Sequence, residues 1–230
     1  MTEAALRDEM CRIGKSLFDR GYVHATAGNI SVRLDDGFLI TPTDTCLGAL
    51  DPARLARIDT NGAQVSGDKA SKTIVLHTQI YNAATTYQAD TRCVIHTHST
   101  YCVALTLNQP GQCALPETLL GAELLCAVTP YFVMKVGHVP LIPYYRPGAV
   151  EAAVAVADAI HRYGQADRPI RAVMLSRLGP NVWHDSPSAA MATLEELEET
   201  AKLVSKNQSL VSALTEPQLN ELRQAFDVKW

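Results

Sequence analysis

Two histidines separated by one residue, His96 and His98, are the side chains of this sequence whose spacing points most directly to chemistry. They follow the apolar run Cys93–Ile95, which predicts a buried strand. Successive side chains of a strand alternate between its two faces, so both imidazoles are expected to point to the same side. Two imidazoles that converge at a strand end indicate the beginning of a transition-metal site. The alternative is two polar residues at the point where the strand leaves the core.

Three polar loops could bind an anion such as phosphate. The loop Thr26–Asn29 contains a small glycine, which lets backbone N–H groups approach a ligand. The pair Ser71–Lys72 is expected to start a helix, where the helix dipole and a lysine charge act together. Each loop alone is also compatible with ordinary turn chemistry. The remaining loop is Thr43–Asp44. The candidate phosphate-binding residues of the three loops are Gly28, Asn29, Thr43, Asp44, Ser71 and Lys72.

An aromatic and basic run, Tyr144–Arg146, forms a further candidate binding segment. The guanidinium of Arg146 could hold a carboxylate through two parallel hydrogen bonds, with Tyr145 beside it. The alternative is a loop in which these side chains simply pack.

Hydrophobic periodicity and turn residues predict helices and strands interspersed along residues 1–230, which we interpret as one domain. In the first helix Leu6, Met10, Ile13 and Leu17 share one stripe, and Gly21 ends it. Further helices are expected at 52–56, at 72–85 with Ser71 as its cap, after Ser99, at 149–163, at 187–213 and from Thr215. Strands are expected at 30–34, 38–40, 57–59, 64–65, 93–96, 139–142, 172–175 and 181–183. This order predicts an α/β fold of the α+β type, with a central, mostly antiparallel sheet and helices on both faces.

The composition argues against several classes of partner. The net charge is −4, the charged fraction is 19%, and no cluster of Lys and Arg indicates a nucleic-acid partner. No apolar run approaches the ~18 residues of a membrane span, and the N-terminus does not resemble a signal peptide, so no membrane partner is expected. Six scattered cysteines without a CxxC pair predict reduced thiols in a cytoplasmic protein.

Five segments together resemble the class II aldolase/adducin superfamily over nearly the whole chain. They are TAGNISVR (26–33), ITPTD (40–44), KASKTIVLH (69–77), VIHTHS (94–99) and EELEETAKL (195–203). Three more segments are similar to the 3-oxo-tetronate 4-phosphate decarboxylases of that superfamily: LDDGFLITPTDTCLGALDP (34–52), TPYFVMKVG (129–137) and PLIPYYRPG (140–148). The resemblance implies a class II aldolase-like fold and a lyase of carbohydrate metabolism.

The same resemblance implies a cofactor, a substrate and an assembly. A divalent metal, zinc, would be held by His96 and His98 and would stabilise an enediolate as a Lewis acid. The substrate would be a small phosphorylated sugar acid of the 3-oxo-tetronate 4-phosphate type, whose phosphate the polar loops bind. The chain would form a homotetramer with its sites at subunit interfaces.

Two positions depart from the pattern of the superfamily. Thr73 stands where the resemblance places a catalytic glutamate, and threonine cannot act as a general base near neutral pH without a partner. Leu178 stands where it places a third metal-binding histidine. His138 and His184 are candidate replacements for that histidine, and His24, His77 and His161 rank behind them. The candidate catalytic residues are Thr73, Tyr145, Arg146 and Arg177, the last as a fixed positive charge.

Three functions therefore remain open from the sequence. The first is a metal-dependent decarboxylase of a phosphorylated 3-oxo sugar acid. The second is an aldolase that acts on a phosphorylated ketose, against which the threonine at position 73 counts. The third is a member of the superfamily with a lost or altered metal site, which binds a small ligand or runs a metal-free reaction.

Overall fold

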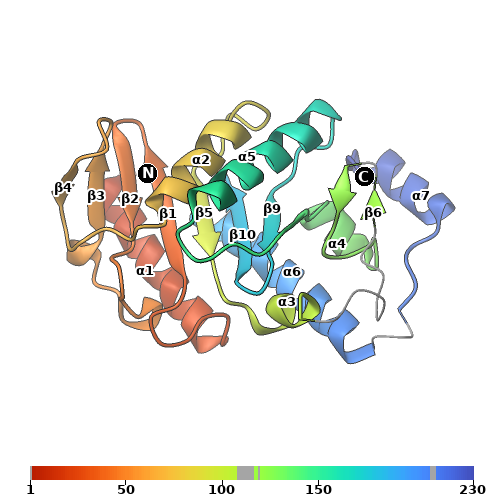
Figure 1. The fold of residues 1–230 in the computed structure, drawn as a ribbon, viewed down its shortest axis with the longest axis horizontal. Coiled ribbons are helices and arrows are strands. Elements are labelled where there is room, and N and C mark those ends of the chain that lie inside the picture. The colour runs from red at the N-terminus through yellow and green to blue at the C-terminus, as the bar shows by residue number, and fades with distance from the viewer. Residues whose placement is uncertain (1, 108–116, 119, 208–210) are drawn as a thin grey trace.

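The computed structural model describes residues 2–107, 117–118, 120–207 and 211–230 (Figure 1). The α-helices are α1 (Glu3–Asp19), α2 (Ile74–Ala84), α3 (Thr100–Leu105), α4 (Pro130–Lys135), α5 (Val150–Gln165), α6 (Pro187–Asn207) and α7 (Glu216–Phe226), and two 3-10 turns are η1 (Leu47–Ala49) and η2 (Pro52–Arg54). The strands are β1 (Asn29–Leu34), β2 (Gly37–Ile40), β3 (Ala56–Asp59), β4 (Gln64–Ser66), β5 (Cys93–His96), β6 (Glu117–Thr118), β7 (Gly121–Ala122), β8 (Leu141–Ile142), β9 (Ala172–Leu175) and β10 (Gly179–His184).

Within these ranges, eight strands form one sheet in the order β4-β3-β2-β1-β5-β10-β9-β8. Every neighbouring pair is antiparallel except β8 and β9, which run parallel. The short strands β6 and β7 pair separately. The mostly antiparallel sheet predicted from the sequence is confirmed, and the histidine strand β5 lies in its middle, between β1 and β10.

Helices cover both faces of the sheet, which also confirms the prediction (Figure 1). On one face α2 and α5 lie side by side and pack through residues such as Ile80 and Val156. On the other face α1 and α6 contribute Met10 and Leu194 to the larger core. Cys93 and Ile95 of β5 face this larger core and Val94 faces α2 and α5, as the period of a strand requires. Burial of each large apolar side chain contributes roughly 1.5–3 kcal/mol to this arrangement.

The chain just after the histidines is held by a buried carboxylate. Glu198 of α6 is 4% exposed and accepts hydrogen bonds from the backbone N–H groups of Tyr101 and Cys102, at 2.9 and 3.0 Å. These two groups begin α3 and have no partner within their own helix. The contact therefore ties the exit of β5 to the long helix behind the sheet.

Several boundaries differ from the predictions. The helix expected at 187–213 ends at Asn207, and residues 211–215 are not helical, while 208–210 lie outside the described residues. Ser71 is not a helix cap: α2 begins later, at Ile74, and the Ser71 carbonyl accepts its first N–H. The strand expected at 139–142 is reduced to its last two residues, because Pro140 has no N–H to donate to a ladder.

Three short elements between residues 117 and 135 lie in a stretch without clear hydrophobic periodicity. Neither α4 nor the pair β6 and β7 was expected from the sequence. Cys113, one of the six cysteines, lies in 108–116, outside the described residues.

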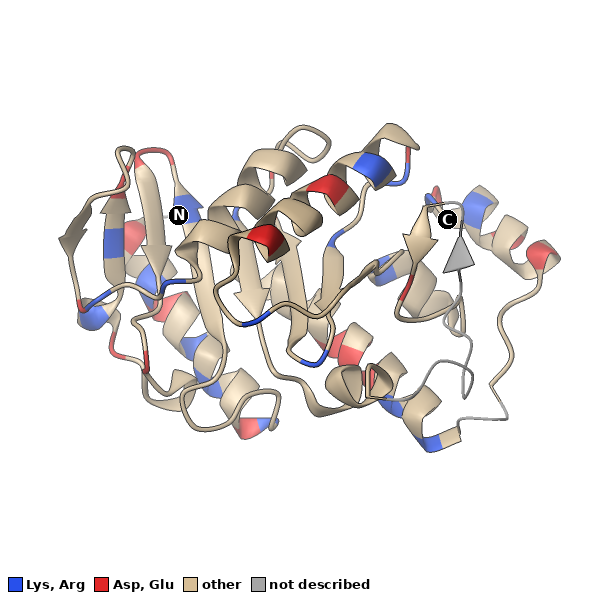
Figure 2. Cartoon of the chain, in the orientation of Figure 1, with Lys and Arg blue, Asp and Glu red and all other residues tan. Residues whose placement is uncertain are grey.

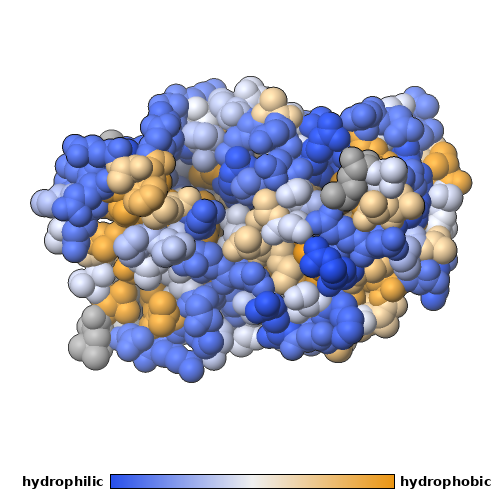
Figure 3. All heavy atoms as spheres, turned by 180° about the vertical axis from the view of Figure 1, so that it is seen from behind, coloured by the Kyte–Doolittle hydropathy of each residue, from blue (hydrophilic) through white to orange (hydrophobic). Residues whose placement is uncertain are grey.

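The described surface agrees with the composition. Figure 2 shows Lys and Arg interspersed with Asp and Glu along the helices. Figure 3 shows several separate apolar patches on the opposite side of the molecule, divided by polar surface. No helix in the described part of the chain is both long and apolar enough to cross a membrane.

Candidate active site

The two histidines of the motif lie together at one end of the central strand. Their ring centroids are 5.1 Å apart, with an angle of 68° between the ring planes. Both line one cavity of about 610 Å³. His96 is 5% exposed, and its Nδ1 lies 3.0 Å from the carbonyl of Pro180. Because a carbonyl can only accept, Nδ1 carries the proton and Nε2 keeps a free lone pair.

Both imidazoles are neutral near pH 7. Burial, and then the nearby His98, lower the pKa of His96 from 6.5 to about 4, although the bond to Pro180 opposes the shift. Burial and the neighbouring His24 lower the pKa of His98 as well. Neutral imidazoles are the form that binds a metal or accepts a proton.

The polar loops converge because β-type hydrogen bonds join them. The Thr43 N–H donates to the Lys69 carbonyl at 2.9 Å, and the Ser71 N–H donates to the Thr41 carbonyl at 3.2 Å. The Thr41 hydroxyl in turn accepts from the backbone N–H of Ile30, at 3.1 Å. All six candidate phosphate residues line the same cavity as the histidines: Gly28, Asn29, Thr43, Asp44, Ser71 and Lys72. Their role in binding phosphate stays a prediction.

Gly28 is the position in these loops that only glycine suits. Its φ is +85°, and a Cβ atom there would lie 2.6 Å from Val23 Cγ1 and 3.0 Å from the carbonyl oxygen of His96. A side chain would therefore be strained and would push the loop away from the histidine strand. The glycine keeps the backbone of the loop close to His96.

The lining of the cavity also includes two residues of the aromatic and basic run. Tyr145 and Arg146 line it, next to the beginning of α5. Neither Arg146 nor Lys72 forms an ion pair within the described part of the chain. The cavity thus combines two uncompensated cations with one carboxylate, that of Asp44, which suits an anionic ligand.

The remaining catalytic candidates are placed differently. Thr73 lines the cavity, and its hydroxyl lies 2.8 Å from that of Ser71. Arg177 is exposed and does not line the cavity, although its neighbours Ser176 and Leu178 do. Its backbone adopts φ +63° and its N–H donates to the Thr106 hydroxyl at 2.9 Å.

Leu178 is held beside the histidines by a tight turn. At the next residue, Gly179, a Cβ atom would lie 1.9 Å from the Thr97 carbonyl oxygen and 3.2 Å from the Cα of His98. The turn therefore packs directly on the His96–His98 segment. Leu178 lines the cavity and packs among the apolar side chains beneath α2 and α5.

The cavity offers a metal two good ligands. Two imidazoles bound to one tetrahedral zinc ion, with Zn–N bonds of about 2.1 Å, have ring centroids about 5.2 Å apart. The 5.1 Å between His96 and His98 matches that geometry, and the hydrogen bond of His96 Nδ1 to a carbonyl is the usual support of a metal-bound histidine. Among the described residues, however, no group of three His, Cys, Asp or Glu is close enough to hold an ion. The two histidines fit a metal, and a third protein ligand is not in place.

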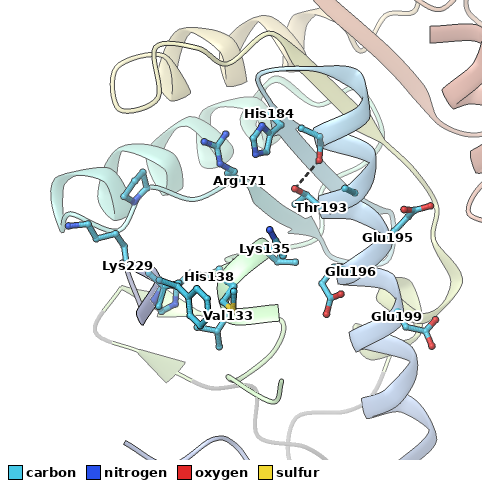
Figure 4. Close-up of a pocket in the computed structure, with 18 of the residues that line it drawn as sticks. Val133, Lys135, His138, Arg171, His184, Thr193, Glu195, Glu196, Glu199 and Lys229 are labelled. Carbon is cyan, nitrogen blue, oxygen red and sulfur yellow. Dashed lines mark hydrogen bonds between the residues drawn. The ribbon is translucent and has the colours of Figure 1, made fainter. Parts of the chain in front are cut away.

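The two candidate replacements for the third ligand lie elsewhere. His138 and His184 line a second cavity of about 880 Å³, bounded by α4, α6 and the C-terminal segment (Figure 4). His138 is buried against Glu123, 2.9 Å from its Nδ1, and stacks on Trp230. His184 pairs with Asp185, and its backbone is opposite Cys93, at the far end of β5 from His96.

Two buried asparagines lie beside His96 in the sheet, and the second of them, Asn181, was not among the site residues predicted from the sequence. Asn29 and Asn181 flank His96 in the sheet register, on β1 and β10. The amide of Asn181 is fully buried, and neither of its polar atoms has a hydrogen-bond partner among the described residues. The signal in the sequence was an asparagine within an otherwise apolar strand, Pro180–Trp183.

One layer further in, His77 joins α2 to the sheet. Its Nδ1 lies 2.7 Å from the Ser31 hydroxyl, which lies 2.8 Å from the Tyr81 hydroxyl. Complete burial, and then the nearby His96, lower the pKa of His77 from 6.5 to about 3. The folded protein therefore keeps this imidazole neutral under conditions in which the unfolded chain protonates it.

Comparison with known proteins agrees with this geometry. The model of the class II aldolase and adducin N-terminal domain family matches residues 8–205. A 3-oxo-tetronate 4-phosphate decarboxylase of Cupriavidus necator is 50% identical, over 100% of this chain and 99% of that protein. One of Escherichia coli is 42% identical, over 88% of this chain and 87% of that protein.

Solved structures show the same fold. The crystal structure of YgbL from Klebsiella pneumoniae superposes with a TM-score of 0.81 at 38% identity, covering 97% of this chain and 100% of that one. An L-fuculose 1-phosphate aldolase superposes with a TM-score of 0.77 at 23% identity, covering 99% and 98%.

This chain therefore belongs to the class II aldolase and adducin N-terminal domain family. Its decarboxylase and aldolase relatives indicate a carbon–carbon lyase, and membership of the family implies a divalent metal.

The pKa of His77 makes a prediction about acid stability. Between pH 6.5 and about 3 the unfolded chain binds a proton at this residue and the folded chain does not, so the free energy of unfolding falls as the pH falls. The contribution approaches about 1.4 kcal/mol per pH unit. In His77→Gln, urea unfolding should show a shallower fall between pH 7 and pH 5. The difference between the two proteins at pH 8 measures the packing effect alone, and parallel stability curves would contradict the assignment.

Proposed function

We propose that this chain decarboxylates a 3-oxo-tetronate 4-phosphate. The observation that carries the proposal is one cavity lined by the phosphate-type loops with Lys72, by Arg146 and by two neutral imidazoles. The substrate has a phosphate at one end and a carboxylate at the other, so two separate cations suit it. The relatives with 50% and 42% identity, both 3-oxo-tetronate 4-phosphate decarboxylases, support the same choice.

The phosphate would lie among the converging loops. Backbone N–H groups near Gly28 and at the start of α2, the hydroxyls of Thr43 and Ser71, and the Lys72 ammonium would surround it. Asn29 and Asp44 would complete this end of the cavity, the first as a donor and the second as an acceptor for a substrate hydroxyl.

The carboxylate would be oriented by Arg146 and Tyr145. The bond between the carboxylate carbon and C2 breaks, its electron pair passes to the C3 carbonyl as an enolate, and carbon dioxide leaves. A proton added at C2 then gives dihydroxyacetone phosphate. Thr73 would hydrogen-bond the substrate through its hydroxyl. Arg177, which is exposed between the lining residues Ser176 and Leu178, would contribute positive charge.

Zinc is the metal we propose for His96 and His98, since imidazole nitrogen is among its preferred ligands. When bound, such an ion supplies Lewis-acid stabilisation of an enolate oxygen. The hydrogen bond to the Pro180 carbonyl orients the His96 ring and leaves the Nε2 lone pair to bind the ion.

We also propose that the chain works as a homotetramer in the cytoplasm, as the family resemblance implies. The thiols of Cys11, Cys46, Cys93 and Cys102 form no disulfides among the described residues, which supports a reducing compartment. Exposed aromatic side chains, such as Tyr131 at 63% and Phe226 at 57%, offer area for subunit contacts. Light scattering at micromolar concentration should give four times the mass of the chain, and a monomer would contradict the assembly.

The reaction itself is tested by its products. Purified protein supplied with a divalent metal and 3-oxo-tetronate 4-phosphate should release carbon dioxide and dihydroxyacetone phosphate in equal amounts. L-Fuculose 1-phosphate should yield dihydroxyacetone phosphate without carbon dioxide only if the chain is an aldolase. Turnover of neither compound would favour the third possibility, a family member with an altered activity.

Lys72 tests the proposed phosphate end. Lys72→Ala removes a cation that has no other partner in the described part of the chain, and a hydrogen bond to a charged group contributes about 1.5–3 kcal/mol. We expect KM to rise at least tenfold with a smaller change in kcat. The matched control is Lys69→Ala, because Lys69 is exposed three residues away and does not line the cavity. Equal KM values for the two variants would count against a phosphate at this end.

A further inference from the structure

A third imidazole lies next to the pair of histidines, although it comes from another part of the chain. His24 is in the loop between α1 and β1, and its ring centroid is 6.2 Å from that of His98, at an interplanar angle of 73°. His98 is in turn 5.1 Å from His96. The three rings therefore form a series with His98 in the middle.

His24 is close to a ligand position but not in it. Two imidazoles on one tetrahedral zinc ion have centroids about 5.2 Å apart, so the separation of His24 from His98 is about 1 Å too long. This explains why no three His, Cys, Asp or Glu of the described residues are yet close enough to hold an ion. A shared site therefore requires the His24 ring to move toward the pair.

The loop leaves that side chain able to rotate. His24 is exposed, and its ring forms no hydrogen bond or ion pair with the described residues; its one ring contact there is the edge contact with His98. Its backbone is held more firmly, because the His24 carbonyl accepts the N–H of Ala27 at 2.9 Å and Ala25 adopts φ +47°. The backbone thus presents the ring at the edge of the site while its torsion angles stay adjustable.

Three other side chains near the pair were considered as the third ligand of the metal. Leu178 is held beside His98 by the Gly179 turn, and its isobutyl group cannot bind a metal. The Nδ1 of His77 is engaged by Ser31, and the ring is completely buried in the layer behind. Asp44 lines the cavity and is the one competing carboxylate there among the described residues.

We propose that His24, His96 and His98 together bind one zinc ion, with His24 turning inward to supply the third imidazole. The fourth position would stay open to water or substrate, as in a catalytic zinc site. This site does not depend on the substrate proposed above, because it can be measured without any substrate present.

A calorimetric titration of zinc into the metal-stripped full chain tests the proposal. The unmodified protein should bind one zinc ion per chain, and His24→Ala should weaken that binding at least tenfold, or about 1.4 kcal/mol. With cobalt(II) as a second probe, the strong visible absorption typical of four-coordinate cobalt should decrease in His24→Ala. Because His24 is exposed, the variant should keep its fold, which circular dichroism can verify.

Three further variants separate His24 from its competitors. His184→Ala removes a histidine of the second cavity and should leave zinc affinity unchanged. Asp44→Asn should lower the zinc affinity less than His24→Ala does. Leu178→His in the His24→Ala background should restore binding, because position 178 projects beside His98.

Four outcomes would overturn the proposal. They are the absence of zinc binding by the unmodified chain, unchanged affinity in His24→Ala, a larger loss in Asp44→Asn than in His24→Ala, and an equal loss in the His184→Ala control. None of them depends on turnover, so they are distinguishable from a failure of the decarboxylase assay.

Discussion

The pairing of β5 with both β1 and β10 is the constraint on which the whole candidate site depends. It places Asn29 and Asn181 directly across from His96, so a polar row crosses the middle of an otherwise apolar sheet. Two close backbone contacts support that row: Gly28 against His96, and Gly179 against Thr97. Glycine is required at both places, because each has a positive φ and a side chain would separate the loops from β5.

Such a row is costly for the fold. Burial of a polar side chain removes its hydrogen bonds to bulk water, and Asn181 is fully buried in this row. His77 is also kept neutral by burial. The two large cores on either side of the sheet offset these terms, which is typical of sites where stability is given up for function.

Two residues of the cavity lining, Thr73 and Leu178, have side chains that limit the chemistry of the site. Thr73 provides a hydroxyl in place of a carboxylate, so proton transfer near α2 depends on other groups. Leu178 provides an apolar surface beside two imidazoles. A decarboxylation needs no base to begin the bond cleavage, and the charges of Lys72 and Arg146 in the lining suit an anionic ligand. The lining is therefore more compatible with loss of carbon dioxide than with cleavage that requires a strong base.

Local patterns were enough to predict the sheet and its helices, because the apolar period of Leu6–Leu17 and the run Cys93–Ile95 depend only on which faces are buried. The same patterns failed at Ser71 and at the end of α6, where tertiary hydrogen bonds and packing decide the boundary. The resemblance brought the polar loops and the two histidines under one hypothesis. It could not reveal that His24 lies beside His98, or that His138 and His184 line a different cavity. By itself the sequence determined the fold class and the residue types of the site; only the tertiary structure decided which of them meet, because contacts between distant segments depend on strand register and turn geometry.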